Sequence, residues 1–200
     1  MAKREARKDK KYRKLANRYD NGLAGKASKR FYDLLSEEVV LYNGMRLLDV
    51  GCGTGALIKR LCNGRNIEAY GTDTDVKMVE IASRQYPDGS FQKTVSGRMP
   101  FTSESFDVLV ACMAYYQFPD KSEFAREAAR VLKPGGCLYI ADPKFPFIIR
   151  KAIHGVRRAF RIVGEFQTAK EMADRFSEFG LQHKGTVARG YAQVVKFAKL

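Results

Sequence analysis

The chain has 200 residues, of which 45% are hydrophobic and 29% charged, and a formal net charge of +14. One core of that size is stable without disulfide staples, and four widely spaced cysteines with no C-x-x-C pair disfavour zinc and disulfide sites. No apolar run approaches the roughly 20 residues that span a bilayer, and the N-terminus shows no secretory signal, so we expect a single cytoplasmic domain over residues 1–200 with no metal site.

The predicted elements alternate between helix and strand. Apolar spacing predicts helices at 2–18, 26–41, 54–63, 75–85, 120–132, 147–163 and 171–179, and strands at 45–50, 66–72, 91–95, 106–112, 136–142, 181–187 and 192–198. This alternation predicts an α/β fold with right-handed crossovers and a mostly parallel sheet that is covered on both faces. The short link at 188–191 predicts an antiparallel hairpin, so the last strand should run against the others.

The first strand leads into a glycine-rich turn and a helix, as LLDVGCGTGA over residues 47–56. Glycines let the backbone approach a ligand closely, and the free N–H groups of a helix N-terminus point at it. This arrangement predicts a nucleotide site. The spacing Gly51-x-Gly53-x-x-Ala56 also fits the dinucleotide pattern, although that match alone is weak.

Three features favour a ligand other than NAD. Asp49 lies two residues before the first glycine, where a carboxylate suits a positively charged ligand better than a pyrophosphate. About 44 residues precede this strand, whereas a dinucleotide fold commonly begins with it, and the closing hairpin leaves no catalytic domain.

Asp73 follows Gly55 by 18 residues, close to the ~20-residue offset of an acid that binds ribose hydroxyls. The alternative for this stretch is a helix cap, and we expect Thr74 or Asp75 to cap while Asp73 binds.

Four motifs in this order resemble those of class I S-adenosylmethionine-dependent methyltransferases, in particular the small-molecule group of ubiquinone and menaquinone biosynthesis. They are LLDVGCGTG at 47–55, YGTDTD with Met78 at 70–78, RMPFTSESFDVLVA at 98–111 and RVLKPGG at 130–136. The resemblance covers roughly residues 19–199. It implies a three-layer, Rossmann-like fold with a seven-stranded sheet whose last strand is antiparallel, and S-adenosyl-L-methionine as cofactor with S-adenosyl-L-homocysteine as product.

The resemblance also implies which residues contact the cofactor. Asp49 would face the methionine amino group, Asp73 the ribose hydroxyls, and Thr74 and Met78 the adenine. The full implied set is Tyr19, Asp49, Gly51, Cys52, Gly53, Asp73, Thr74, Met78, Ser96, Gly97, Arg98, Met99, Ala111 and Cys112. Met113 would border the methyl group. Ser96 departs from the family pattern, since many relatives carry an acid there.

Methyl transfer is an in-line displacement with a neutral leaving group, so orientation alone can supply about 7–11 kcal/mol of the barrier. A base is needed only if the acceptor must lose a proton. The candidate catalytic residues are Tyr115, Tyr116, Asp142 and His154. For the tyrosines we favour a role as pocket wall, and for Asp142 the alternative is a loop cap. The histidines that relatives often carry after the fourth strand are absent from residues 114–118.

Two short segments carry most of the positive charge. Residues 1–20 have nine Lys or Arg against three acids, and residues 144–161 have six with no acid. We interpret residues 1–43 as a basic helical lid and residues 144–166 as a basic amphipathic insertion. The purely structural interpretation is an amphipathic helix whose charged face is exposed to solvent and whose apolar face packs against the core. The functional alternatives are a peripheral membrane contact through residues 147–163, a pocket for an anionic small molecule, and a grip on RNA phosphates, of which RNA is the least favoured.

The sequence therefore predicts a methyltransferase that acts on a small-molecule acceptor of lipophilic or anionic character. The alternative function is an RNA-associated methyltransferase or a non-catalytic cofactor-binding protein on the same fold.

Overall fold

The computed structural model describes residues 20, 22–159 and 164–200, with the backbone alone at residues 23, 24, 26 and 157–159. The expected helix at 2–18 and Tyr19 lie outside these residues. The strands are β1 (Arg46–Val50), β2 (Glu68–Asp73), β3 (Ser90–Lys93), β4 (Phe106–Cys112), β5 (Leu132–Pro143), β6 (Leu181–Arg189) and β7 (Ala192–Lys199). The helices are α2 (Leu23–Glu38), α3 (Ala56–Cys62), α4 (Val76–Gln85), α5 (Lys121–Val131), α6 (Phe147–Ala159), α7 (Ala169–Ser177) and a 3-10 turn, η1 (Tyr115–Gln117).

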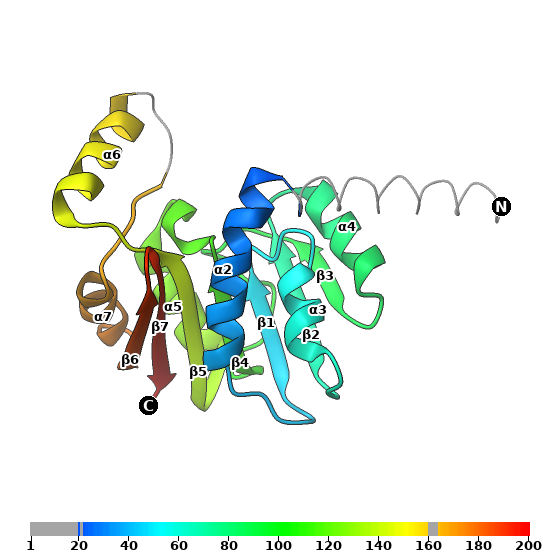
Figure 1. The fold of residues 1–200 in the computed structure, drawn as a ribbon. Helices are drawn as coiled ribbons and strands as arrows, with labels where there is room; N and C mark the ends of the chain where they lie inside the picture. Colours follow the sequence, from blue (N-terminus) through cyan, green and yellow to red (C-terminus); the bar gives the residue numbers. More distant parts are fainter. Residues whose placement is uncertain (1–19, 21, 160–163) are drawn as a thin grey trace.

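The strands form one seven-stranded sheet in the order β3-β2-β1-β4-β5-β7-β6 (Figure 1). β1 to β5 pair in parallel, whereas β7 pairs antiparallel with β5 on one side and with β6 on the other. The last strand of the chain therefore lies inside the sheet. The predicted three-layer, mostly parallel sheet with an antiparallel last strand is confirmed.

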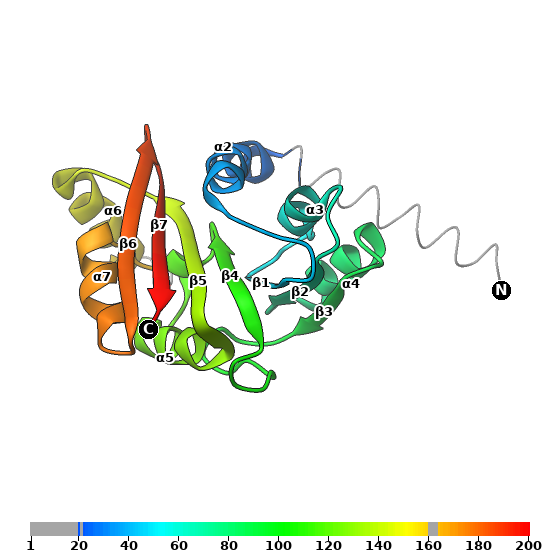
Figure 2. The same cartoon turned by 90° about the horizontal axis from the view of Figure 1, so that it is seen from below.

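Helices cover both faces of the sheet, with α2, α3 and α4 on one face and α5 and α7 on the other (Figure 2). Each face has its own core, because neighbouring residues of a strand point to opposite sides. Leu47 of β1 packs in the core that includes Phe31 of α2 and Leu57 of α3. Leu48 packs in the core that includes Phe124 of α5 and Phe176 of α7.

Local capping sets where several helices begin. Gly55, at φ 77°, precedes α3 in the left-handed region that glycine tolerates. Asp75 caps α4, since its carboxylate accepts a hydrogen bond from the Lys77 N–H at 2.8 Å. The expectation that Thr74 or Asp75 caps this helix is thus confirmed in favour of Asp75. Thr168 and Glu171 form a reciprocal capping box on α7.

Three of the differences from the predicted element boundaries have a clear local cause. α2 spans 23–38 rather than 26–41, because Val39 already has extended backbone. The Thr168 cap starts α7 two residues before the predicted start. Leu132 pairs with Phe106 and Cys137 next pairs with Val108, so residues 133–136 loop out of β5, where the sequence predicts a turn.

α6 follows β5 and stands beyond the edge of the sheet at which the parallel strands end (Figure 1). It covers most of the predicted helix at 147–163, whose last residues, 160–163, are outside the described part. Within that part, no helix is long and apolar enough to cross a membrane.

Candidate functional site

The glycine turn after β1 lies against the end of β2. The N–H groups of Gly51 and Cys52 both donate to the Thr72 carbonyl, at 2.7 and 2.9 Å. Gly51 has φ 83°, and a Cβ there would lie 2.5 Å from the Cβ of Ala114. No residue with a side chain fits at this point without displacing the chain after β4. A Cβ on Gly53 meets no described atom within 4 Å, so the turn is open on that side.

A cavity of about 430 Å³ lies over this turn, at the carboxyl ends of β1, β2 and β4. Parallel α/β sheets bind their ligands at this edge. Eight residues of the predicted cofactor set line the cavity: Gly51, Cys52, Gly53, Asp73, Thr74, Met78, Ser96 and Cys112. The structure therefore brings together residues that are spread over positions 51–112 of the chain.

Asp73, at the tip of β2, is held in a fixed orientation. One carboxylate oxygen accepts the Gly53 N–H at 2.9 Å and the other accepts the Asp75 N–H at 2.9 Å. An ionised carboxylate has about four lone-pair sites. Asp73 can therefore accept further hydrogen bonds from a ligand in the cavity while it holds the glycine turn in place.

Asp49 lies one residue before the cavity-lining Val50 and is 1% exposed. Its Oδ1 has no hydrogen-bond partner among the described residues. Burial, and secondarily the charge of Asp73, raises the pKa of Asp49 to about 8. A buried acceptor of this kind is costly unless a donor reaches it. A cationic donor group in the cavity would satisfy it.

Six members of the predicted cofactor set are not among the residues that line the cavity, and five of these six are described. Ala111 is fully buried inside β4, and Met99 is buried with its N–H on Glu127 of α5. A Cβ on Gly97 would lie 2.7 Å from Glu123 of the same helix. Arg98 is exposed, and Asp49 lies beneath the lining as described. Tyr19 lies outside the described residues.

Several lining residues lie outside the predicted cofactor set. Ser28 and Tyr32 project from α2, while Gln117 and Phe118 follow β4 through η1. The remaining ones are Val50, Thr54, Thr72, Asp75, Thr94, Val95, Met113, Ala114 and Pro119, of which Met113 is the residue expected beside the methyl group. The predicted lid at 1–43 includes α2, but no local pattern singles out Ser28 and Tyr32, because only the packing of α2 against the sheet brings them to the cavity.

The four candidate catalytic residues lie outside the cavity lining. Tyr115 is fully buried and its hydroxyl donates to Gln167 Oε1 at 2.8 Å, and burial raises the pKa of this tyrosine. The Tyr116 ring stacks on Phe166, with centroids 4.8 Å apart. Neither tyrosine is among the residues that line the cavity, so the role of pocket wall stays a prediction, as does the catalytic one.

Asp142 and His154 hold backbone rather than facing the cavity. Asp142 is 1% exposed, and its Oδ2 accepts the Tyr116 N–H at 2.7 Å, which fixes the start of η1. Burial raises the pKa of Asp142 well above its usual value, and its Oδ1 has no partner among the described residues. His154 of α6 accepts the Phe166 N–H on Nε2 at 3.0 Å. Their predicted catalytic roles remain untested predictions.

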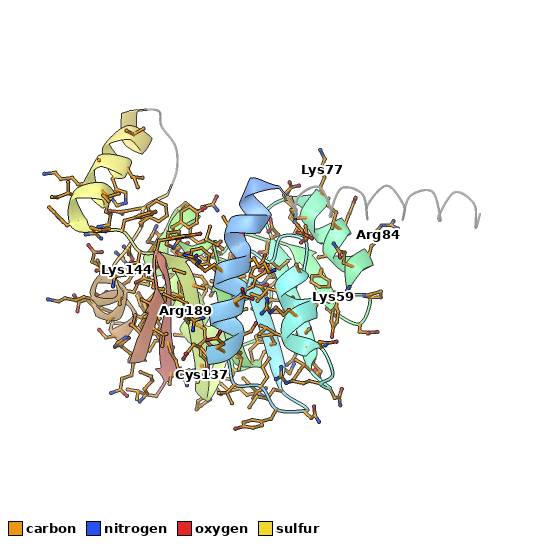
Figure 3. The ribbon with its side chains drawn as sticks, viewed as in Figure 1. Lys59, Lys77, Arg84, Cys137, Lys144 and Arg189 are labelled. Atoms are coloured by element: carbon orange, nitrogen blue, oxygen red, sulfur yellow. The ribbon has the colours of Figure 1, made fainter. Side chains whose placement is uncertain are left out.

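The helices next to the cavity carry basic side chains on their outer surfaces. Figure 3 shows Lys59 on α3 and Lys77 and Arg84 on α4, on the outside of the molecule. Among the described residues that line the cavity, however, the ionisable ones are limited to aspartate, cysteine and tyrosine. Burial raises the pKa values of Cys52 and Cys112, so neither thiol is a ready base. The described part of the chain also holds no cluster of side chains placed to bind a metal ion.

Comparison with known proteins gives consistent results. Residues 48–140 match the family model described as a methyltransferase domain. A demethylmenaquinone methyltransferase from Chlorobaculum parvum is 37% identical over 101 residues, which cover 50% of this chain and 42% of that protein. A 27-O-demethylrifamycin SV methyltransferase from Amycolatopsis mediterranei is 33% identical over 126 residues, covering 58% of this chain and 45% of that protein.

The structural similarity extends further along the chain. The crystal structure of a SAM-dependent methyltransferase from Aquifex aeolicus matches with a TM-score of 0.66 and 21% identity, over 96% of this chain and 98% of that one. At this identity the match shows the fold alone. The chain spans about half the length of the curated relatives it matches.

Proposed function

On the premise that residues 48–140 form a class I S-adenosylmethionine-dependent methyltransferase domain, we propose that the chain transfers a methyl group to a small-molecule acceptor. The observation that carries the proposal is the cavity at the carboxyl ends of β1, β2 and β4, with the glycine turn and two acids beside it. The cofactor would be S-adenosyl-L-methionine and its product S-adenosyl-L-homocysteine. A cytoplasmic location stays a prediction.

The residues present fit this cofactor. The unpartnered Oδ1 of Asp49 suits a cationic amino group, which a buried carboxylate attracts strongly. Asp73 has acceptor sites left for ribose hydroxyls, and the open side of Gly53 leaves room for a ligand against the backbone. When bound, the cofactor supplies a methyl group on a positively charged sulfur. Thr74, Met78 and Ser96 would border its adenine.

The chain would act mainly by orientation. The only carboxylates among the described lining residues, Asp73 and Asp75, already accept hydrogen bonds from the backbone of the glycine turn and of α4, and no histidine, lysine or glutamate stands beside them as a base for an acceptor proton. Its walls instead supply shape: Met113 and Phe118 on one side and Tyr32 of α2 on another. Fixing two reactants in line can contribute about 7–11 kcal/mol. This supports an acceptor that needs little or no help in losing a proton.

The acceptor class is proposed from two observations. The Chlorobaculum relative is named for demethylmenaquinone, which favours a quinone-type, lipophilic acceptor. Apolar side chains of α6 are exposed beyond the same edge of the sheet as the cavity, which favours the same class. Transfer of labelled methyl to a demethylated quinol in detergent, compared with a water-soluble phenolate, tests this choice. Activity on the phenolate alone would contradict it.

Calorimetric titration with S-adenosyl-L-homocysteine tests the cofactor site. Asp73→Ala removes charge-assisted hydrogen bonds worth about 1.5–3 kcal/mol, so we expect roughly 10- to 150-fold weaker binding. Asp73→Asn keeps an acceptor for the Gly53 N–H and should lose less. Asp88→Asn, an exposed acid away from the cavity, is the matched control and should bind as the wild type does. Equal affinity of Asp73→Ala and wild type would remove Asp73 from the site.

The same titration separates the competing functions. NAD in place of S-adenosyl-L-homocysteine should give no heat of binding, and a short RNA should bind weakly and lose that binding at high salt. Tight binding of NAD, or RNA binding stronger than cofactor binding at physiological salt, would contradict the proposed function.

A further inference from the structure

α6 is amphipathic, and its apolar face points away from the protein. Ile148 is 80% exposed and Val156 57% exposed, and Ala152 between them is also exposed. These three residues follow one another at i, i+4 and i+8, so they share one face of the helix. Ile149, 50% exposed, flanks the same face. We call these four residues the outer stripe.

On the opposite face, Arg150 and His154 attach α6 to the body. Arg150 pairs with Glu171 of α7 and donates to the Phe166 carbonyl at 3.4 Å. His154 accepts the Phe166 N–H, and its ring stacks near Phe166 with centroids 6.1 Å apart. A surface helix of a globular protein ordinarily buries its apolar stripe and exposes the charged one. α6 does the reverse, in contrast to the purely structural interpretation of the sequence, in which the charged face is the exposed one.

The exposed apolar side chains are also concentrated on this helix. Among the described residues, four of the eleven large exposed hydrophobic side chains lie on α6: Phe147, Ile148, Ile149 and Val156. Such a patch marks an interaction site when it is contiguous. The patch is bordered by exposed Lys151 and by Lys144, which lies where β5 leads into α6 (Figure 3).

We infer that the outer stripe of α6 inserts into the headgroup region of an anionic lipid bilayer. Charge complementarity selects this occupant. Residues 144–161 contain six Lys or Arg and no acid, in a chain of net charge +14. Interfacial helices combine low overall hydrophobicity, a basic border and a few inserted apolar side chains, and each basic residue near an anionic surface adds to the attraction.

A second copy of the chain fits this surface less well. Two outer stripes facing each other would bring the exposed Lys144 and Lys151 of both copies together, with no acid in residues 144–161 to offset them. A stable protein interface takes roughly 20–30 residues a side, and the outer stripe supplies four of them. A bilayer needs neither an acidic partner side chain nor a large flat surface.

This inference rests on the proposed function only for the role of membrane binding, which would bring the cavity to lipophilic acceptors. Binding to vesicles is therefore measured on the full chain without cofactor or acceptor. We expect flotation with vesicles of phosphatidylcholine and phosphatidylglycerol, and none with phosphatidylcholine alone. Ile148→Ser/Val156→Ser should lower the partition coefficient at least about tenfold. Val40→Ser/Val187→Ser, which removes two exposed valines outside α6, is the matched control and should float as the wild type does.

A tryptophan reporter tests insertion itself, because the chain contains no tryptophan. Ile148→Trp should show a blue-shifted emission on the anionic vesicles, whereas Val187→Trp should not. The inference is overturned if wild type does not float, if the double serine variant floats equally well, or if the Ile148→Trp emission does not shift. A stable dimer that the double serine variant dissolves, in the absence of flotation, would assign the stripe to a second copy instead. Normal cofactor binding by a non-floating wild type would leave the proposed function intact.

Discussion

Two buried carboxyl groups lie at the carboxyl edge of the sheet with different surroundings. Asp142 holds the Tyr116 N–H, whereas Asp49 lies under the cavity with one oxygen unpartnered among the described residues. Burial raises the pKa of both. Because a burial-raised pKa means that the folded state holds a proton the unfolded chain has released, each group makes stability fall as the pH rises.

The pH dependence of Asp49 can be isolated with Asp49→Asn. The folded pKa is about 8 against an ordinary value of 3.8, so between these values the folded state binds more protons than the unfolded state. The free energy of unfolding should therefore decline by up to about 1.4 kcal/mol per pH unit in this window, level off above pH 8, and show its full value below pH 4. Urea unfolding of the ligand-free protein at pH 5 to 8.5 should give a shallower decline for Asp49→Asn. Parallel curves for the two proteins would refute the assignment.

For Asp142 we expect a positioning role. Asp142→Ala leaves the buried Tyr116 N–H without its acceptor and should cost about 1–3 kcal/mol of unfolding free energy. Asp142→Asn keeps an acceptor oxygen and should cost less and retain kcat for methyl transfer within a few-fold. A general base would respond differently, since Asp142→Asn would then abolish kcat while the protein stayed folded. Denaturation and initial-rate measurements on both variants separate the two roles.

At the residue scale, the sequence allowed us to predict the cavity-lining residues that lie in or beside a motif. Gly51, Gly53 and Asp73 line the cavity because a strand–turn–helix unit places its own ends locally. Tyr32 could not be found this way, because α2 reaches the cavity only through packing across the sheet. Gly97 and Met99 were assigned by resemblance, and in this chain they lie against α5.

The attachment of α6 to α7 depends on one acidic side chain with two tasks. Glu171 closes the capping box with Thr168 and also pairs with Arg150 of α6. Hydrogen bonds from Arg150 and Thr168 hold the pKa of Glu171 below its ordinary value, against the opposing effect of burial. The helix that carries the outer stripe is therefore fastened at the N-terminus of its neighbour.

Glu171→Gln should separate these two tasks. The amide oxygen can still accept the Thr168 N–H, so α7 should remain capped, but the charge that pairs with Arg150 is lost. We expect amide hydrogens of α6 to exchange up to about fivefold faster, with little change in α7. Glu178→Gln, an exposed acid at the end of the same helix, is the control. Unchanged exchange in α6 would show that the ion pair contributes nothing to its attachment.

At the scale of elements, the sequence predicted which segments are helices better than which way they face. Apolar periodicity identifies α6, since Ile149, Ala152 and Val156 recur at helical spacing. Periodicity alone does not say whether an apolar face meets a core, and here the pairing of Arg150 and the hydrogen bond of His154 decide the orientation. The turn at residues 133–136 could be predicted, by contrast, because it depends on local backbone geometry and not on packing. Gly135 adopts a φ of 76°, which glycine tolerates.

The molecule as a whole has two cores that share one sheet. Ile58 of α3 and Ile140 of β5 are fully buried on opposite faces. Since the sheet separates them, we expect Ile58→Val and Ile140→Val each to lower the unfolding free energy by about 0.5–1.5 kcal/mol, and the double variant to lose the sum within about 0.5 kcal/mol. Urea unfolding followed by circular dichroism checks this. A marked departure from the sum would mean that packing on one face is transmitted to the other.

The strand order of the sheet was only partly accessible from sequence. The alternation of helix and strand predicts parallel crossovers, and the link at 188–191 predicts the hairpin. Whether β6 or β7 lies next to β5 is decided by side-chain burial. The pattern of β7 is mostly buried, whereas that of β6 is exposed beyond Leu181, so β7 takes the interior position.

That interior position has a consequence for synthesis on the ribosome. β5 is translated long before β7, and until β7 emerges the outer edge of β5 presents unpaired N–H and C=O groups to other nascent chains. Premature termination before residue 192 would leave that edge permanently open, since β6 pairs with β7 and not with β5. Truncated products should accordingly be the species that chaperones and proteases must recognise, while the emergence of β7 is the event that commits the sheet to its native strand order.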